Sequence, residues 1–322
     1  MKLNKLNNTY IFIGVITSLV VFGFSFIDNS SDKKNAIALG KLLFSEKILS
    51  KDSSVSCSSC HKPAFAFADT TAFSIGINNQ LTSRNTPSVL NMKNRPYYFY
   101  DGRANSLAEQ ALMPIQNPDE MGLPIDIAIE RLNQSVFYKN YFRKVFRSLP
   151  NKKNLAEAFA AYEKTLETID SKFDDWSNNL TNLSASEERG REIFIGEKAK
   201  CFNCHFLEDF TNDDFKNIGL YNSTSLNDSG RAVITNKKSD LGKFKTPGLR
   251  NIAVTAPYMH NGMFNTLEEV VDYYNDTKKF VSNSINIDTA LEKPLGLTEL
   301  EKKDLVAFLK TLTDKAFYKN SP

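Results

Sequence analysis

The feature that most constrains this chain is a pair of five-residue motifs of the form C-x-x-C-H, at residues 57–61 and 201–205. In such a motif two thiols form thioether bonds to the vinyl groups of a haem, and the adjacent histidine is an axial iron ligand. A zinc site made from both cysteine pairs would leave His61 and His205 without a role. We therefore predict two covalent c-type haems, with His61 and His205 as proximal ligands. The pair contains every cysteine of the chain: Cys57, Cys60, Cys201 and Cys204.

The histidine count limits how the two irons can be ligated. The chain has three histidines, so only His260 remains once each haem has its proximal ligand. Two haems with two histidine ligands each therefore cannot form. At least one iron takes a methionine, a tyrosine, another side chain or water on its distal side, or leaves that side open. An open position is what catalysis on peroxide or oxygen requires, so the count favours an enzyme over an electron carrier. We expect His260 to be structural.

The N-terminus has the form of an export segment. Lys2 and Lys5 precede an apolar stretch at residues 10–27, and a polar stretch follows. The length fits both a cleaved signal sequence and an uncleaved membrane anchor, and the sequence leaves the two open. We predict that residues 1–32 form this segment and that the rest is periplasmic, with or without an inner-membrane anchor, because covalent haem attachment occurs outside the bacterial cytoplasm. A net charge of +3 argues against nucleic acid as a partner.

The rest of the chain predicts a mainly α-helical fold with two similar halves and much irregular loop. A glycine, a basic residue and a phenylalanine recur at residues 40–44 and 190–194, before each C-x-x-C-H motif. This weak repeat indicates two cytochrome c-like domains, at residues 33–175 and 176–322. Residues 62–102 and 206–257 are predicted to be irregular, and residues 170–183 to be a linker in which Trp176 packs at the domain junction. Apolar periodicity and capping residues predict helices at 36–44, 106–111, 125–132, 136–146, 155–169 and 267–274, and helices that begin at 184 and 298.

Further motifs surround the haem motifs in a fixed order. In the first half they are R-N-T-P-S-V-L-N at residues 84–91, Y-D-G-R at 100–103, E-Q-A at 109–111 and E-M-G at 120–122. In the second half they are F-K-T-P-G-L-R-N at residues 244–251 and T-A-P-Y-M-H-N-G at 255–262. With these motifs, the chain from about residue 36 to its end resembles the bacterial di-haem cytochrome c peroxidases and their MauG-type relatives.

The resemblance implies roles for several residues around the first haem, which it makes the peroxidatic one. Gln110 and Glu120 match the family's distal positions. A carboxylate there can move a proton between the two oxygens of peroxide, and an amide can hold peroxide or water. Many of these peroxidases have a removable distal histidine where this chain has Ile77, so we expect a site that is open without reductive activation. Tyr100 stands where the family has a tryptophan between the haems, and it is a candidate electron relay.

The resemblance also implies the sixth ligand of the second haem, which would receive electrons from the donor. In the peroxidases this ligand is a methionine in a short helix after the P-Y-x-H-x-G motif. Here that position is Tyr274, and a tyrosine there is the MauG-type feature. The alternatives are Met259 and Met263, with Tyr274 as a core aromatic residue.

A calcium ion between the haems is a further implication of the resemblance. Its protein ligands map to the Asn85 side chain and to the carbonyl groups of Thr255 and Pro257. Oxygen ligands on a turn-rich backbone suit this hard cation.

Two enzymatic functions and one carrier function follow from these features. The first is a peroxidase that reduces hydrogen peroxide to water with electrons from a small cytochrome or cupredoxin. The second is a MauG-like enzyme that oxidises a protein or small molecule through a high-valent di-haem state, which Ile77 and Tyr274 favour. A purely electron-transferring cytochrome is disfavoured by the missing sixth ligand. The sequence leaves the donor and the oligomeric state open, a homodimer included.

Overall fold

The computed structural model describes residues 29–206 and 208–320. Most of the predicted export segment lies outside these residues, and the first helix, α1, already begins at Asn29. Within the described ranges, no helix is both long and apolar enough to cross a membrane.

The first half is built on the crossing of α1 (Asn29–Phe44) and α7 (Lys152–Glu163). A Cβ atom on Gly40 would overlap the Ala158 carbonyl oxygen and lie 2.8 Å from Tyr162 Cβ, so a glycine permits this close approach. The Phe44 ring packs edge-on against Tyr162, with 5.4 Å between the centroids. The helices between them are α2 (Cys57–Cys60), α3 (Leu107–Gln110), α4 (Met113–Gln116), α5 (Ile125–Gln134) and α6 (Val136–Phe146).

The second half repeats this crossing with α9 (Ala185–Ile195) and α12 (Glu299–Lys310). A Cβ atom on Gly190 would overlap the Asp304 carbonyl oxygen and lie 2.8 Å from Phe308 Cβ. Phe194 packs against Phe308, with 5.2 Å between the centroids. The repeat in the sequence is therefore a repeated helix crossing. The other elements are α8 (Lys172–Ser177), β1 (Phe215–Lys216), α10 (Ala232–Thr235), β2 (Phe244–Lys245) and α11 (Leu267–Asn275).

The prediction of a mainly helical fold is confirmed, one helix boundary is corrected, and the predicted linker proves to contain a helix. The predicted helix 155–169 ends at Glu163 as α7. It stops there because Asn91 Oδ1 accepts hydrogen bonds from the N–H and the hydroxyl of Thr168, which hold the next segment against a loop. The predicted linker 170–183 contains α8, whose first turn Ser171 caps by accepting from Asp174 N. In the described part of the chain, the only sheet is the antiparallel pair β1–β2.

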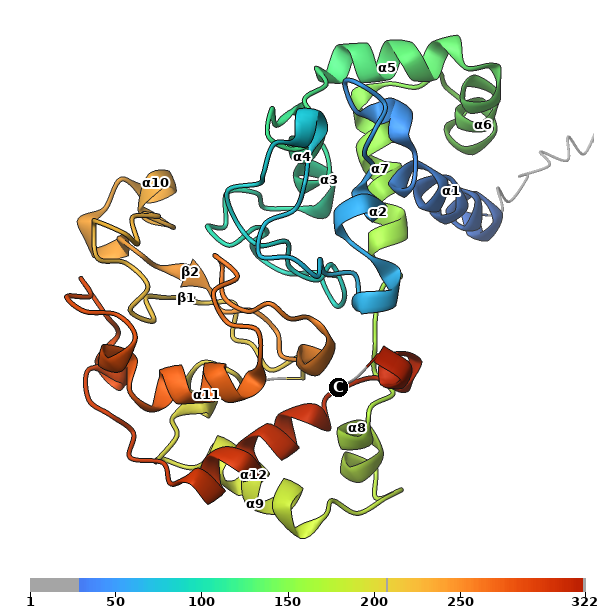
Figure 1. The fold of residues 1–322 in the computed structure, drawn as a ribbon. Helices are drawn as coiled ribbons and strands as arrows, with labels where there is room; N and C mark the ends of the chain where they lie inside the picture. The colour runs from blue at the N-terminus through green and yellow to red at the C-terminus, as the bar shows by residue number, and fades with distance from the viewer. Residues whose placement is uncertain (1–28, 207, 321–322) are drawn as a thin grey trace, which may run out of the picture.

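The two halves, upper right and lower left in Figure 1, meet along polar contacts between segments far apart in sequence. Arg84 donates to the Asp228 carboxylate at 2.7 and 2.8 Å and to Asp101 at 2.7 Å. The Tyr100 carbonyl accepts from Lys245 N of β2 at 2.7 Å. These bonds fix the loop before α3 against the segment around β2. The domain limits 33–175 and 176–322 stay a prediction.

Candidate functional site

The first C-x-x-C-H motif forms the short helix α2, which Ser56 begins. The two cysteines are not joined in a disulfide, and burial raises the pKa of the Cys57 and Cys60 thiols. His61 Nδ1 lies 3.1 Å from the Phe67 carbonyl oxygen, and burial lowers the pKa of this imidazole. A neutral ring that donates from Nδ1 has Nε2 available for iron. The motif therefore fits covalent attachment of a haem with His61 as its axial ligand.

Glu120 lies in the turn after α4, near this motif. Its Oε1 accepts a hydrogen bond from Asn117 Nδ2 at 2.7 Å, and burial raises its pKa. A charge on Glu120 also raises the pKa of both Cys57 and Cys60, so the carboxyl is within electrostatic reach of the attachment site. A carboxyl with a raised pKa is protonated more readily than an ordinary one, which suits a group that accepts and returns a proton.

Ile77 and Gln110 complete the predicted first site. Ile77 is buried, its N–H donates to the Glu120 carbonyl at 2.8 Å, and its Cδ1 occupies the space that a side chain on Gly122 would need. Where many similar peroxidases have a removable histidine, this chain thus has an apolar side chain packed against the Glu120 turn. Gln110 is the last residue of α3, and its half-buried side chain forms no hydrogen bond with Glu120 among the described residues.

The second motif lines a cavity of about 320 Å³. Protein interiors contain few voids larger than a water molecule, and a volume of this size is typical of a site for a bound organic group. Cys201, Cys204 and His205 are on its wall. His205 Nδ1 lies 2.8 Å from the Phe210 carbonyl oxygen, and burial lowers the pKa of the ring, as for His61. These residues fit a second covalent haem with Nε2 of His205 on the iron.

Two of the three sixth-ligand candidates line this cavity. They are Tyr274, in α11, and Met259. Met263 is not part of the wall, and its sulfur lies 3.7 Å from Asn261 Nδ2. Burial raises the pKa of Tyr274, and charges on Cys204 and Cys201 raise it further. The identity of the ligand stays a prediction.

The neighbouring Tyr273 shows what a core tyrosine looks like in the same helix. It is fully buried, and its hydroxyl donates to the Ile218 carbonyl at 2.6 Å. The Tyr274 hydroxyl has no such bond among the described residues, although its side chain lines the cavity. The helix therefore buries one phenol as packing and leaves the other available to a bound group.

Tyr100 and the predicted calcium ligands lie on the wall of the same cavity. The wall includes Tyr100, Asn85, Thr255 and Pro257, so the structure brings together residues from both halves. Burial raises the pKa of Tyr100. Asn85 Nδ2 donates to the carbonyls of Thr71 and Ala72, at 3.1 and 3.3 Å, which leaves Oδ1 as an acceptor. Amide and carbonyl oxygens are the donor set that Ca²⁺ prefers. His260 is also in this wall, stacked on Phe244 with 3.8 Å between centroids.

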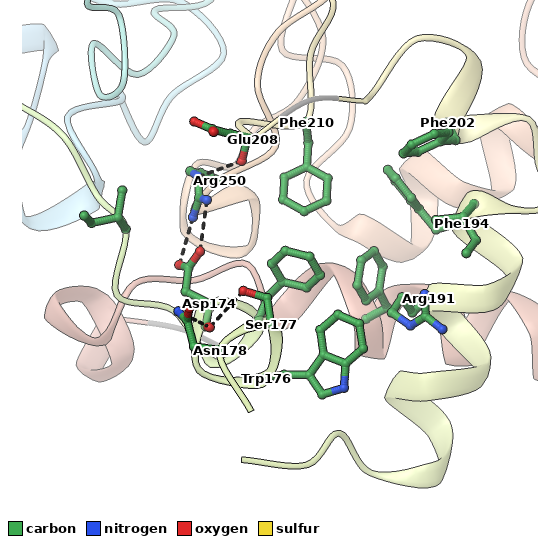
Figure 2. Close-up of a pocket in the computed structure, with 14 residues that line it drawn as sticks. Asp174, Trp176, Ser177, Asn178, Arg191, Phe194, Phe202, Glu208, Phe210 and Arg250 are labelled. Carbon is green, nitrogen blue, oxygen red and sulfur yellow. Dashed lines mark hydrogen bonds and ion pairs between the residues drawn. The ribbon is translucent and has the colours of Figure 1, made fainter. Parts of the chain in front are cut away.

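A second pocket, of about 560 Å³, lies beside the His205 segment (Figure 2). Trp176 packs against Phe173, which contacts Phe210, and the ring centroids are 5.5 and 5.1 Å apart. The arginines on its wall already have carboxylate partners: Arg250 binds Asp174, as Figure 2 shows, and Arg191 binds Glu188. Trp176 thus packs within the second half, and rings connect it to the residue whose carbonyl orients His205.

Sequence reasoning missed one buried carboxyl in the first half. Glu163 ends α7 with 4% of its surface exposed, and its Oε2 has no hydrogen-bond partner in the described part of the chain. Burial alone raises its pKa to about 8. The spacing could have revealed it, because Leu155, Phe159 and Glu163 are four residues apart and share one apolar helix face.

Comparisons with known proteins agree with this arrangement of motifs. Residues 34–182 match the family model described as di-haem cytochrome c peroxidase. The chain is 38% identical to the methylamine utilization protein MauG of Methylorubrum extorquens, over 86% of this chain and 77% of that protein. It is 36% identical to the cytochrome c551 peroxidase of Nitrosomonas europaea, over 85% and 79% of the two chains.

Solved structures have the same fold. A MauG-like protein associated with microbial copper homeostasis superposes with a TM-score of 0.79 and 32% identity, over 88% of this chain and 92% of that one. The diheme peroxidase BthA from Burkholderia thailandensis superposes with a TM-score of 0.79 and 26% identity, over 89% and 88%. The chain therefore belongs to the di-haem cytochrome c peroxidase family of enzymes, which includes both peroxidases and MauG proteins.

Proposed function

We propose that this protein is a peroxidase that reduces hydrogen peroxide to water at the haem on His61. The reaction consumes two electrons and two protons and yields two molecules of water. The observation that carries the proposal is the difference between the two sites. A buried carboxyl, Glu120, and an apolar residue, Ile77, adjoin the first motif, whereas a phenol, Tyr274, faces the cavity of the second.

In this proposal the chain supplies iron ligands and moves protons around the first haem. His61 Nε2 would hold the iron, and the hydrogen bond from Nδ1 to the Phe67 carbonyl sets the ring orientation. The haem, when bound, supplies an iron with an exchangeable distal position. Glu120 accepts a proton from the inner oxygen of peroxide and returns it to the outer one, while the Gln110 amide holds peroxide or water by hydrogen bonds. The apolar Ile77 side chain offers no ligand of its own.

The second haem is the proposed electron inlet. His205 Nε2 and the Tyr274 oxygen would hold its iron, and an anionic oxygen ligand would favour the oxidised iron and so a low potential. Tyr100, on the cavity wall and bonded through its carbonyl to β2, is the proposed relay to the first haem. A calcium ion on Asn85, Thr255 and Pro257 would brace the two halves. The donor is a small cytochrome or cupredoxin, and the protein acts after export to the periplasm.

A MauG-like oxidation of a protein or small molecule is the second candidate. Ile77 at the expected histidine position and Tyr274 in the cavity favour it, as does the 38% identity to a MauG protein. Both functions use the same open first site. They differ in whether the oxidising equivalents are removed by a fast electron donor or by an organic substrate.

Steady-state peroxide turnover with a reduced cytochrome c separates the two candidates. Under the peroxidase proposal the ferric protein binds cyanide at one haem without prior reduction, and Glu120→Gln slows turnover by about 10²–10⁴. Glu157→Gln, an exposed carboxyl on α7, is the matched control and leaves the rate unchanged. Two irons inert to cyanide would refute the open site. A wild-type protein that binds cyanide but turns over no faster than Glu120→Gln would favour the MauG-like function.

A further inference from the structure

The two helix crossings assign equivalent positions to α7 and α12. Gly40 of α1 packs on Ala158 and Tyr162, and Gly190 of α9 packs on Asp304 and Phe308. In both helices the two contacted residues are four apart. The crossings therefore align α7 with α12 residue by residue, with no insertion in either helix. The residue after Tyr162 is therefore equivalent to the residue after Phe308.

These next residues are Glu163 in the first half and Leu309 in the second. Leu309, with Leu305 one turn earlier, lines the cavity that contains Cys201 and His205. By the shared crossing, Glu163 faces the corresponding space beside α2. A charge on Glu163 raises the pKa of Cys57, which agrees with this position. A haem attached at Cys57 would thus meet a carboxyl where one attached at Cys201 would meet a leucine.

No basic side chain compensates this carboxyl in the described part of the chain. A charge on Glu163 raises the pKa of three titratable groups, which are Cys57, Tyr98 and Tyr162. The charged side chains on the helices packed against α7 do not pair with Glu163. Lys41 of α1 and Glu109 of α3 are exposed, and Arg131 of α5 donates to the carbonyls of Ile48 and Ser50. Burial therefore favours the neutral form of this carboxyl.

We propose that Glu163 is the proton-linked group of the first haem, taking up one proton from solvent when that haem takes up one electron and releasing it on reoxidation. The electron comes from the donor of the peroxidase reaction. The physical reason is electrostatic: each electron removed from the haem would leave an added positive charge beside a buried carboxyl, and that charge favours the carboxylate. The proposal rests on a haem attached at Cys57.

A redox titration of both haems in the holoprotein, from about pH 4 to about pH 9, tests this role; the range covers the ordinary carboxyl pKa of 4.5 and the raised value of about 8. The potential of the first haem should fall by up to about 59 mV per pH unit, since one pH unit is tenfold in proton activity. Glu163→Gln and Glu163→Leu should both abolish this slope, and the Leu variant reproduces the second half. Glu157→Gln, exposed on the same helix, should keep it.

A second readout separates Glu163 from Glu120. The redox-difference infrared spectrum should contain a carboxylic acid C=O band that disappears in Glu163→Gln and persists in Glu120→Gln. A pH slope that survives in Glu163→Gln, or that is absent from the wild type, overturns the proposal. Haem content, measured on the same samples, is a separate test: a single haem per chain refutes the proposed function, whereas two haems with an unchanged slope in Glu163→Gln refute only this role.

Discussion

Replacing Arg84 by alanine should destabilise the protein by about 3 kcal/mol, because it breaks a partly buried ion-pair network between the halves. The Arg84 side chain is 17% exposed and forms three hydrogen bonds of 2.7–2.8 Å with Asp228 and Asp101. Removing one partner of a buried pair costs about 3–5 kcal/mol. We expect the lower end of this range because each aspartate retains another hydrogen-bond donor. Asp101 still accepts from Arg103 at 2.9 Å, and Asp228 still accepts from the Gly230 N–H at 2.9 Å.

The measurement is urea unfolding of the holoprotein, with Lys93→Ala as the control. Lys93 pairs with Glu167 at 3.3 Å, but both side chains are more than 40% exposed, so its loss should cost less than about 1 kcal/mol. Equal costs for the two variants would refute the argument that the Arg84 network holds the halves together. A slower electron transfer between the haems in Arg84→Ala alone would connect this contact to function.

The same network predicts a sign for the pH dependence. Burial raises the pKa of Asp228 and Arg84 lowers it, with a net downward shift. A carboxyl with a lowered folded-state pKa stabilises the protein above its unfolded pKa of 3.8, and this stabilisation is lost as the pH falls through the lowered value. The stability difference between wild type and Arg84→Ala should therefore shrink below about pH 4.

Other outcomes test the second half and the metal. Tyr274→Met should raise the midpoint potential of the second haem, because methionine ligands raise haem potentials; an unchanged potential would remove Tyr274 from the iron. Gly190→Ala should destabilise by about 1–3 kcal/mol in urea unfolding, since its Cβ would overlap the Asp304 carbonyl, and a neutral result would contradict the close crossing. Chelation of calcium should lower the melting temperature of the wild type but not that of Asn85→Ala, and an equal decrease in both would move the ion off Asn85.

Local chemistry made much of this fold predictable from the sequence. Ser184 and Thr298 cap α9 and α12 as their S/T-x-x-E patterns indicate, because these bonds form between residues three apart. The end of α7 was not predictable in this way. It depends on Asn91, which binds Thr168 from 77 positions away, and no local pattern contains that contact.

Some residues of the candidate site could likewise be predicted from the sequence, and one could not. The motifs predicted roles for His61, His205 and Tyr274 because attachment chemistry and family resemblance fix residue types at short spacings, and these roles stay predictions. Glu163 was missed because it stands beside Lys164 at a helix end, where a charged pair normally faces solvent. Only the crossing of α1 over α7 shows that the face of Glu163 is turned inward.

The energetics of Glu163 support a chemical rather than a packing explanation for its position. Its folded-state pKa of about 8 exceeds the ordinary 4.5, so the folded protein loses stability as the pH rises from 4.5 towards 8. At neutral pH the loss is about 3 kcal/mol, at 1.36 kcal/mol per pKa unit. At the equivalent position of the α9–α12 crossing the side chain is Leu309, which is buried and carries no ionisable group. The crossing therefore forms with an apolar residue there and without this loss of stability. A carboxyl that destabilises the fold and has no hydrogen-bond partner among the described residues has its explanation in what it would do beside the haem: the charge of this buried region would change by a proton whenever it changes by an electron.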